Sequence, residues 1–188
     1  RLSFSALARE VGLSQPAVAE RVRRLEKSGV LNRYQAVIAR ERIGLPNYIK
    51  TSGSTGLHVL IPLGRQCTFE QCRMLSQLIA QVTVGELPDI ATVHRAMRAR
   101  QGRVYIDSLQ SGHGRLLVSP LCVRPRPGAT VSMPLRWNEV DSTLDPAAFN
   151  IRTAAARMER LGDDPFAPVL HDKPDLPAAL DALLGLLR

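Results

Sequence analysis

Near the N-terminus, apolar residues recur at helical spacing in two segments separated by a glycine. A short amphipathic stretch at residues 5–11 ends at Gly12, a residue that favours a helix C-terminus. Ser14 can cap a second helix, and Pro16 would lie in its first turn, where its missing N–H costs nothing. The apolar stripe of this second helix consists of Val18, Val22 and Leu25. The pattern predicts a helix-turn-helix, although an ordinary helical hairpin has the same pattern.

After residue 50 the spacing of apolar residues alternates between that of strands and that of helices. Strands are expected at residues 57–63, 103–107 and 116–123, and helices at residues 69–84, 91–100, 147–161 and 176–187. In the helix at 69–84, the core-facing residues would be Cys72, Leu75, Ile79 and either Val82 or Thr83. Strands and helices are mixed along the chain, which predicts an α+β fold.

Composition is that of an ordinary folded protein, with 188 residues of which 45% are apolar and 22% charged. No run approaches the roughly 18 apolar residues of a membrane helix, and no signal-peptide pattern is present. A cytoplasmic protein without a membrane partner is therefore expected. The first residue is Arg1 and not methionine, which suggests a fragment or a processed product.

The net charge of +8 is unevenly distributed along the chain. Residues 1–46 carry nine Lys and Arg against four acids (+5), and residues 47–136 carry eleven against four (+7). Residues 137–188 carry five against nine (−4). A basic front suits a polyanionic partner such as nucleic acid, although a solvated basic surface would have the same charge.

The three cysteines, Cys67, Cys72 and Cys122, do not have the spacing of a zinc site or of a disulfide framework. Cys67 and Cys72 are five residues apart near a predicted helix, so they are expected on different faces. Reduced, buried thiols are the expected state.

The N-terminal motif closely resembles the helix-turn-helix of the Lrp/AsnC family of transcription regulators, over about residues 3–46. The residues that carry the resemblance are Leu7-Ala8-Arg9-Glu10-Val11-Gly12-Leu13-Ser14, Val18, Arg21-Val22, Leu25-Glu26, Gly29-Val30-Leu31 and Tyr34. By this resemblance the DNA-facing residues would be Ser14, Gln15, Ala17, Glu20 and Arg21, with Arg23, Arg24 and Lys27 nearer the phosphates. A solvated helix face would carry the same side chains.

The sequence has no counterpart of the helix that precedes this motif in the family, or of the family's effector domain. Without that helix, Val18, Val22 and Leu25 are expected to be only partly covered.

Three features further along could carry phosphate or metal chemistry. The turn Ser52-Gly53-Ser54-Thr55-Gly56 could bring backbone N–H groups to a phosphate, although an ordinary β-turn has the same composition. Asp107, at a strand end, could bind a divalent cation or cap the chain locally. Arg124 and Arg126 lie beside prolines and could grip phosphate, or form an exposed loop.

Together these features resemble the polymerase domain of bacterial DNA ligase D, over about residues 45–170. The matching segments are Lys50-Thr51-Ser52-Gly53-Ser54-Thr55-Gly56-Leu57-His58-Val59, Gly102-Arg103-Val104-Tyr105-Ile106-Asp107, Ser119–Gly128, Pro134-Leu135-Arg136-Trp137 and Ile151-Arg152-Thr153. The resemblance implies a primase-polymerase fold of the archaeo-eukaryotic type. It also implies nucleotide addition at broken DNA ends in non-homologous end joining, with DNA, a nucleoside triphosphate and the end-binding protein Ku as partners.

The resemblance also implies roles for individual residues. Ser52, His58 and Arg124 would hold the triphosphate, and Gln110 would contact the nucleotide. Asp107 would be the third carboxylate of a two-metal centre that holds Mn²⁺ or Mg²⁺. Arg98 and Arg100 would approach DNA phosphate.

The family's paired carboxylates, two aspartates separated by one residue, are not found among residues 1–49. One aspartate is expected to hold two metal ions poorly, so the chain has the lineage of a nucleotidyltransferase but is expected to be catalytically incomplete. The alternative function is that of an Lrp/AsnC-type DNA-binding regulator. The domains expected are a partial helix-turn-helix at 1–46, the C-terminal half of the polymerase domain at 47–170, and a C-terminal helix at 171–188.

Overall fold

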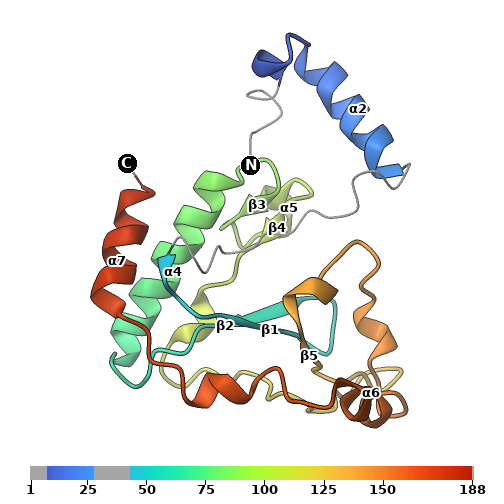
Figure 1. The fold of residues 1–188 in the computed structure, drawn as a ribbon, viewed down its shortest axis with the longest axis vertical. Helices are drawn as coiled ribbons and strands as arrows, with labels where there is room; N and C mark the ends of the chain where they lie inside the picture. The colour runs from blue at the N-terminus through green and yellow to red at the C-terminus, as the bar shows by residue number, and fades with distance from the viewer. Residues whose placement is uncertain (1–7, 28–42, 188) are drawn as a thin grey trace.

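The structure is a computed structural model that describes residues 8–27 and 43–187, with the backbone alone for residues 22–27. Figure 1 shows the arrangement of its elements. The helices are α2 (Gln15–Lys27), α4 (Phe69–Glu86), α5 (Met97–Arg100), α6 (Ala154–Leu161) and α7 (Leu176–Gly185). The strands are β1 (Tyr48–Thr51), β2 (Leu57–Leu60), β3 (Ala91–Thr92), β4 (Val104–Tyr105) and β5 (Pro134–Leu135). Short 3₁₀ turns are η1 (Leu109–Ser111), η2 (Trp137–Glu139), η3 (Pro146–Ala148) and η4 (Ala167–Leu170).

The predicted helix-turn-helix is present in the described residues 8–27. Residues 8–10 are helical, Gly12 has a φ of 65°, and the Ala17 N–H donates to the Ser14 hydroxyl as α2 begins (3.4 Å). The expectation of a partly covered apolar stripe is wrong at Val18, which is 3% exposed. Ala8 is buried as well, so each side of the turn contributes a covered apolar residue.

A three-stranded antiparallel sheet with the order β2-β1-β5 lies at the centre of the rest of the chain. In its register Lys50 pairs with His58, and Ile49 pairs with Val59 on one side and Leu135 on the other. Successive side chains of a strand point to opposite faces of the sheet. Ile49 and Lys50 therefore serve different faces, one apolar and the other carrying the polar residues of the candidate site.

Two apolar clusters cover this framework. One lies between α4 and α7, which run side by side in Figure 1, and it contains Ile43, Leu45, Ile79, Val82, Ala179 and Leu183. The other packs η2 and α6 against the sheet and contains Ile49, Val131, Met133 and Leu135. The expected core positions on α4 are confirmed for Ile79 and Val82, whereas Cys72 is only half-buried.

The start of α4 corrects the prediction for the cysteines. Thr68 caps the helix, and its hydroxyl and the Gln71 side chain form a reciprocal capping box. Cys67 precedes this cap and lies against Cys72, because the chain folds back over the first helical turn. Burial, and then the contact with Cys67, raise the pKa of the Cys72 thiol. Cys67 and Cys72 are half-buried and Cys122 is exposed, so the expectation of buried thiols on different faces is wrong.

Three predicted elements differ from the structure. Residues 91–100 are not one helix: buried Ala91 and Thr92 pair in parallel with β4, and only Met97–Arg100 is helical. Residues 116–123 form no strand, since Leu116 is 94% exposed and the backbone turns through a positive φ at Leu121. The helix expected at 147–161 begins only at Ala154.

The late start of α6 follows from backbone pairing upstream of it. The Phe149 carbonyl accepts a hydrogen bond from the Val131 N–H, and Asn150 forms a β-bridge with Thr130. The helices expected at 69–84 and 176–187 are present as α4 and α7, and the strand expected at 57–63 ends at Leu60. None of the described helices is long and apolar enough to cross a membrane.

The loop from β1 to β2 lies against the segment that carries Arg124, and a glycine allows the approach. Gly53 has a φ of 65°, and a Cβ added there would lie 2.5 Å from Arg124 Cγ and 3.1 Å from the Ser132 backbone nitrogen. The Thr130 hydroxyl donates to the Gly53 carbonyl (2.6 Å). Any larger residue at position 53 would therefore separate the two segments.

We expect Gly53→Ala to lower the free energy of unfolding by about 1–3 kcal/mol, because alanine disfavours this positive φ and its Cβ meets backbone. Urea denaturation followed by circular dichroism measures the change. Gly56→Ala in the same loop is the matched control, since a Cβ there would lie 3.8 Å from the nearest atom, the Ser52 hydroxyl oxygen. Equal losses in the two variants would contradict the close approach described for Gly53.

Candidate functional site

The hydroxyl of Ser52 organises the loop between β1 and β2. Ser52 Oγ accepts hydrogen bonds from the backbone N–H groups of Ser54 (3.1 Å) and Gly56 (3.2 Å). The Ser52 N–H in turn donates to the Gly56 carbonyl (2.8 Å). The loop is thus a tight turn that places the half-buried Ser52 beside the close approach of Gly53 to Arg124.

Arg124 enters the site from a turn that closes on itself. Its backbone N–H donates to the Thr130 carbonyl (2.7 Å), and the neighbouring residues Val123 and Val131 form an antiparallel bridge. The Nε atom of Arg124 is buried and has no hydrogen-bond partner among the described residues. A buried guanidinium donor without a partner needs an acceptor from elsewhere, and an anion would supply one.

Lys50 is the central charged group of the site, although neither the sequence pattern nor the family resemblance predicts a role for it. It lies on β1 with no exposed surface. Its Nζ atom lies 2.6 Å from Ser132 Oγ and 3.0 Å from His58 Nδ1. The signal that could have identified it is a lysine inside a strand whose neighbours, Ile49 and Thr51, are buried too.

The charges of this site perturb one another. Burial, and then the nearby charge of Arg124, lower the pKa of Lys50 to about 8, against a smaller opposing effect of Cys122. Burial, Lys50 and Arg124 lower the pKa of His58 in that order, and Asp107 acts in the opposite direction. At neutral pH the site therefore contains cationic Lys50 and Arg124 beside a neutral imidazole. The charge of the predicted carboxylate, Asp107, thus acts on the imidazole of this site.

Asp107 is exposed and caps its own chain locally. One carboxylate oxygen accepts a hydrogen bond from the Leu109 N–H (3.0 Å) and lies 3.4 Å from the Tyr105 hydroxyl. No group of three or more His, Cys, Asp or Glu side chains that could hold a metal ion occurs among the described residues. Asp107 alone does not provide the carboxylates that a two-metal centre with Mn²⁺ or Mg²⁺ needs.

Gln110 lies one turn beyond Asp107, in η1, and its side chain is exposed. Helix α4 holds this turn in place through the Ser76 hydroxyl, which donates to the Ser108 carbonyl and lies 3.0 Å from Ser111 Oγ.

The basic residues before β4 differ in whether their side chains bond to neighbouring parts of the chain. The Arg100 guanidinium stacks 4.6 Å from the centroid of the Tyr105 ring and donates to the Arg95 carbonyl (2.7 Å). Arg103 donates to the Arg100 carbonyl (3.0 Å) and so covers the C-terminal end of α5. Arg98 is exposed. Tyr105 therefore connects this basic patch with Asp107.

On α2, Gln15 and Arg21 are exposed, as expected for DNA-facing residues. The side chains of Arg23 and Arg24 lie outside the described part of the structure. The structure brings Ser52, His58 and Arg124 together with Lys50, and the charge of Asp107 acts on His58.

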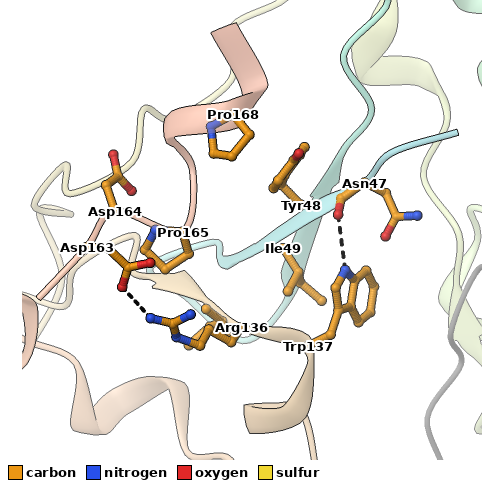
Figure 2. A pocket seen from close by; sticks show the side chains of 10 residues that line it. Asn47, Tyr48, Ile49, Arg136, Trp137, Asp163, Asp164, Pro165 and Pro168 are labelled. Carbon is orange, nitrogen blue, oxygen red and sulfur yellow. Dashed lines mark hydrogen bonds and ion pairs between the residues drawn. The ribbon is translucent and has the colours of Figure 1, made fainter. Parts of the chain in front are cut away.

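A separate cavity of about 250 Å³ lies beside the other end of β1 and is shown in Figure 2. Arg136 and Asp163 form an ion pair in its wall, and the Trp137 indole N–H donates to the Asn47 carbonyl (3.2 Å). None of the predicted nucleotide-binding residues lines this cavity. Because Asp163 already pairs with Arg136, this cavity is less suited to binding an anion than the side of the sheet that carries Lys50.

Two family models match the chain. The model of the LigD primase-polymerase domain matches residues 33–166, and that of the AsnC-type helix-turn-helix domain matches residues 1–26. The predicted boundaries at residues 46 and 170 stay predictions.

Curated relatives agree with both matches. The chain is 33% identical over 143 residues to the bifunctional non-homologous end joining protein LigD of Bacillus subtilis. This match covers 70% of the chain and 23% of that protein. It is 32% identical over 146 residues to the multifunctional non-homologous end joining protein LigD of Pseudomonas aeruginosa, covering 77% of the chain and 17% of that protein. The chain thus spans less than a quarter of the length of these relatives. Over 46 residues it is 44% identical to the HTH-type transcriptional regulator LrpC of Bacillus subtilis, covering 24% of the chain and 32% of the regulator.

Among solved structures, the polymerase domain of Mycobacterium tuberculosis ligase D in complex with DNA is similar, with a TM-score of 0.62 and 28% identity. The match covers 72% of the chain and 46% of that domain's chain. This similarity confirms the predicted α+β fold of the primase-polymerase type. Since the family model spans more than half of the residues, the chain belongs to the LigD primase-polymerase domain family.

Proposed function

We propose that the chain binds a nucleoside triphosphate and DNA as part of a LigD-type polymerase domain in DNA end repair. The observation that carries the proposal is the convergence of Arg124, Lys50 and His58 behind the Ser52 loop. Two cations and a half-buried imidazole meet there, and the charge of Asp107 acts on His58. A polyphosphate is the ligand whose charge matches this arrangement.

The triphosphate would take its hydrogen bonds from groups that the fold already holds in place. Arg124 has a buried Nε without a described partner, and a phosphate oxygen would satisfy it. Ser52 and His58 flank Arg124, Ser52 in a tight loop and His58 on a strand. Ser52 and His58 need little reordering before they bind, which favours affinity. The Arg124 side chain has to turn before its buried Nε–H can reach a phosphate.

DNA is the second proposed ligand. Residues 47–136 carry a charge of +7, and Arg98 is exposed on α5. The similar Mycobacterium tuberculosis domain is a complex with DNA, which supports the same ligand here. Ku as a partner, and templated nucleotide addition, rest on resemblance to relatives of much greater length.

A second candidate function rests on the N-terminal segment. The AsnC-type model matches residues 1–26, and α2 exposes Gln15 and Arg21 on its surface. A helix of this motif that presents polar and basic side chains can enter the major groove of DNA. Sequence-specific binding by α2 would identify this function.

We expect Arg124→Ala to weaken binding of a nucleoside triphosphate by about 1–3 kcal/mol, because a charge-assisted hydrogen bond is lost. Isothermal titration calorimetry measures the affinity. Arg126→Ala is the matched control, since Arg126 lies two residues away, is exposed, and has the same charge. Equal affinities of the Arg124 variant and the unmodified chain would reject the assignment.

The chain by itself is expected not to extend a primed DNA template with Mn²⁺ and nucleotides. The physical reason is that Asp107, the one family carboxylate in the sequence, cannot hold two metal ions by itself. Primer extension resolved on a denaturing gel is the measurement. Extension that disappears in Asp107→Ala would contradict this expectation.

The two candidate functions differ in the basic cluster that binds DNA. With about four to six phosphate contacts, the log–log dependence of affinity on salt should have a slope of about −0.9 per contact. In the polymerase-domain function, Arg98→Gln with Arg100→Gln reduces the slope, and the chain prefers DNA ends. In the regulator function, replacing Arg21, Arg23 and Arg24 by Gln reduces both the slope and any sequence preference.

Fluorescence anisotropy across a salt series, on blunt and closed-end duplexes, distinguishes the two functions. We expect the double variant at Arg98 and Arg100 to show the larger loss. If this variant leaves the salt dependence of DNA affinity unchanged, DNA binding does not come from the polymerase-domain cluster.

A further inference from the structure

We propose that Lys50 is a positioning residue, which holds His58 Nδ1 as an acceptor so that the ring presents its Nε2–H to a phosphate. The proposal rests on the proposed function for the identity of the ligand. It assigns to a buried lysine the task of orienting another residue, without contact between that lysine and the ligand.

The direction of each hydrogen bond follows from the chain of donors. The Ser132 hydroxyl donates its proton to the Thr51 carbonyl (2.8 Å), so its oxygen accepts from Lys50 at 2.6 Å. A lysine ammonium has three donors and no acceptor. Toward His58 Nδ1, at 3.0 Å, Lys50 therefore donates again. The proton of a neutral His58 is then left on Nε2, the other ring nitrogen.

The fold places these groups with little freedom. Lys50 and His58 are direct cross-strand partners in the β1–β2 ladder, so their separation is set by strand register. Lys50 has no exposed surface, whereas His58 is half-buried at the side of the Ser52 loop. The ring thus has one nitrogen on the buried lysine and the other available for a ligand.

The charges around the pair support the same protonation. The lowered pKa of His58 keeps the ring neutral at pH 7, and the pKa of Lys50, lowered to about 8, leaves the lysine mostly protonated there. The other charged or titratable groups that act on the pair are Arg124, Cys122 and Asp107. A neutral ring with a defined tautomer is a directional donor, which a freely titrating histidine is not.

The direct test is the tautomer of His58, read from ¹⁵N chemical shifts of the ring nitrogens in the full chain. We expect a protonated Nε2 and an unprotonated Nδ1 at pH 7.5. Methionine has a similar length to lysine but no hydrogen-bond donor, so Lys50→Met should abolish the preference for the Nε2–H tautomer. A ring with its proton on Nδ1 in the unmodified chain overturns the proposal, even if no variant folds and even if no triphosphate binds.

A double-mutant cycle separates positioning from a general effect on charge or folding. In the background that retains His58, Lys50→Met should weaken tripolyphosphate binding by on the order of tenfold. In a His58→Ala background the same change should cost about twofold, because only its long-range charge remains. Equal losses in both backgrounds overturn the proposal. Tripolyphosphate that fails to bind any variant rejects the proposed function, while the tautomer still decides the role of Lys50.

The pH dependence of binding gives an independent measure. Lys50 is protonated below its pKa of about 8, and an anion stabilises the protonated form, so affinity should fall as the pH rises through 8. Lys50→Arg should remove this fall, because arginine stays charged. Cys122→Ser is the control, since the charge of Cys122 acts on Lys50. A fall that persists in Lys50→Arg but disappears in Cys122→Ser contradicts the role of Lys50.

Discussion

A lysine ammonium enclosed in the central strand constrains the rest of the site. Lys50 has no exposed surface, and a buried charge is costly unless hydrogen bonds compensate it. Its two partners come from different segments, His58 from β2 and Ser132 from the chain leading into β5. Both segments must stay against β1 for the charge to remain satisfied. The same two bonds thus connect β1 with both segments, and in the proposed role they orient the imidazole.

The second constraint is the close approach of two loops on the same side of the sheet. Gly53 has room for no side chain, and the Thr130 hydroxyl bonds to its carbonyl. The approach brings the Ser52 loop to Arg124. The Nε–H of this arginine is buried and has no hydrogen-bond acceptor among the described residues. Cations and donors from three segments therefore converge on one place. Polyanion binding is the chemistry that this arrangement supports.

Nucleotide binding and metal binding are supported unequally by the described residues. The donors expected from the ligase D family are present and converge. Asp107 caps its own chain, and the described residues contain no cluster of three or more His, Cys, Asp or Glu side chains that could hold a metal ion. Phosphate recognition needs only donors and positive charge, whereas a two-metal centre needs several carboxylates at one point. The chain therefore belongs to the family, and its described residues provide groups suited to the proposed phosphate binding but not the carboxylate cluster of a two-metal centre.

The sequence by itself determined the elements and residues whose signal is local. The helices Phe69–Glu86 and Leu176–Gly185 follow from spacing and caps, and motif resemblance predicted Ser52, His58 and Arg124 as site residues. Only tertiary structure decided what depends on partners distant in sequence. Ala91 and Thr92 form a strand because they pair with β4, against their helical pattern. The proposed role of Lys50 could likewise not be predicted from the sequence. Its surroundings are defined by the cross-strand register and by Ser132, which lies 82 residues away along the chain.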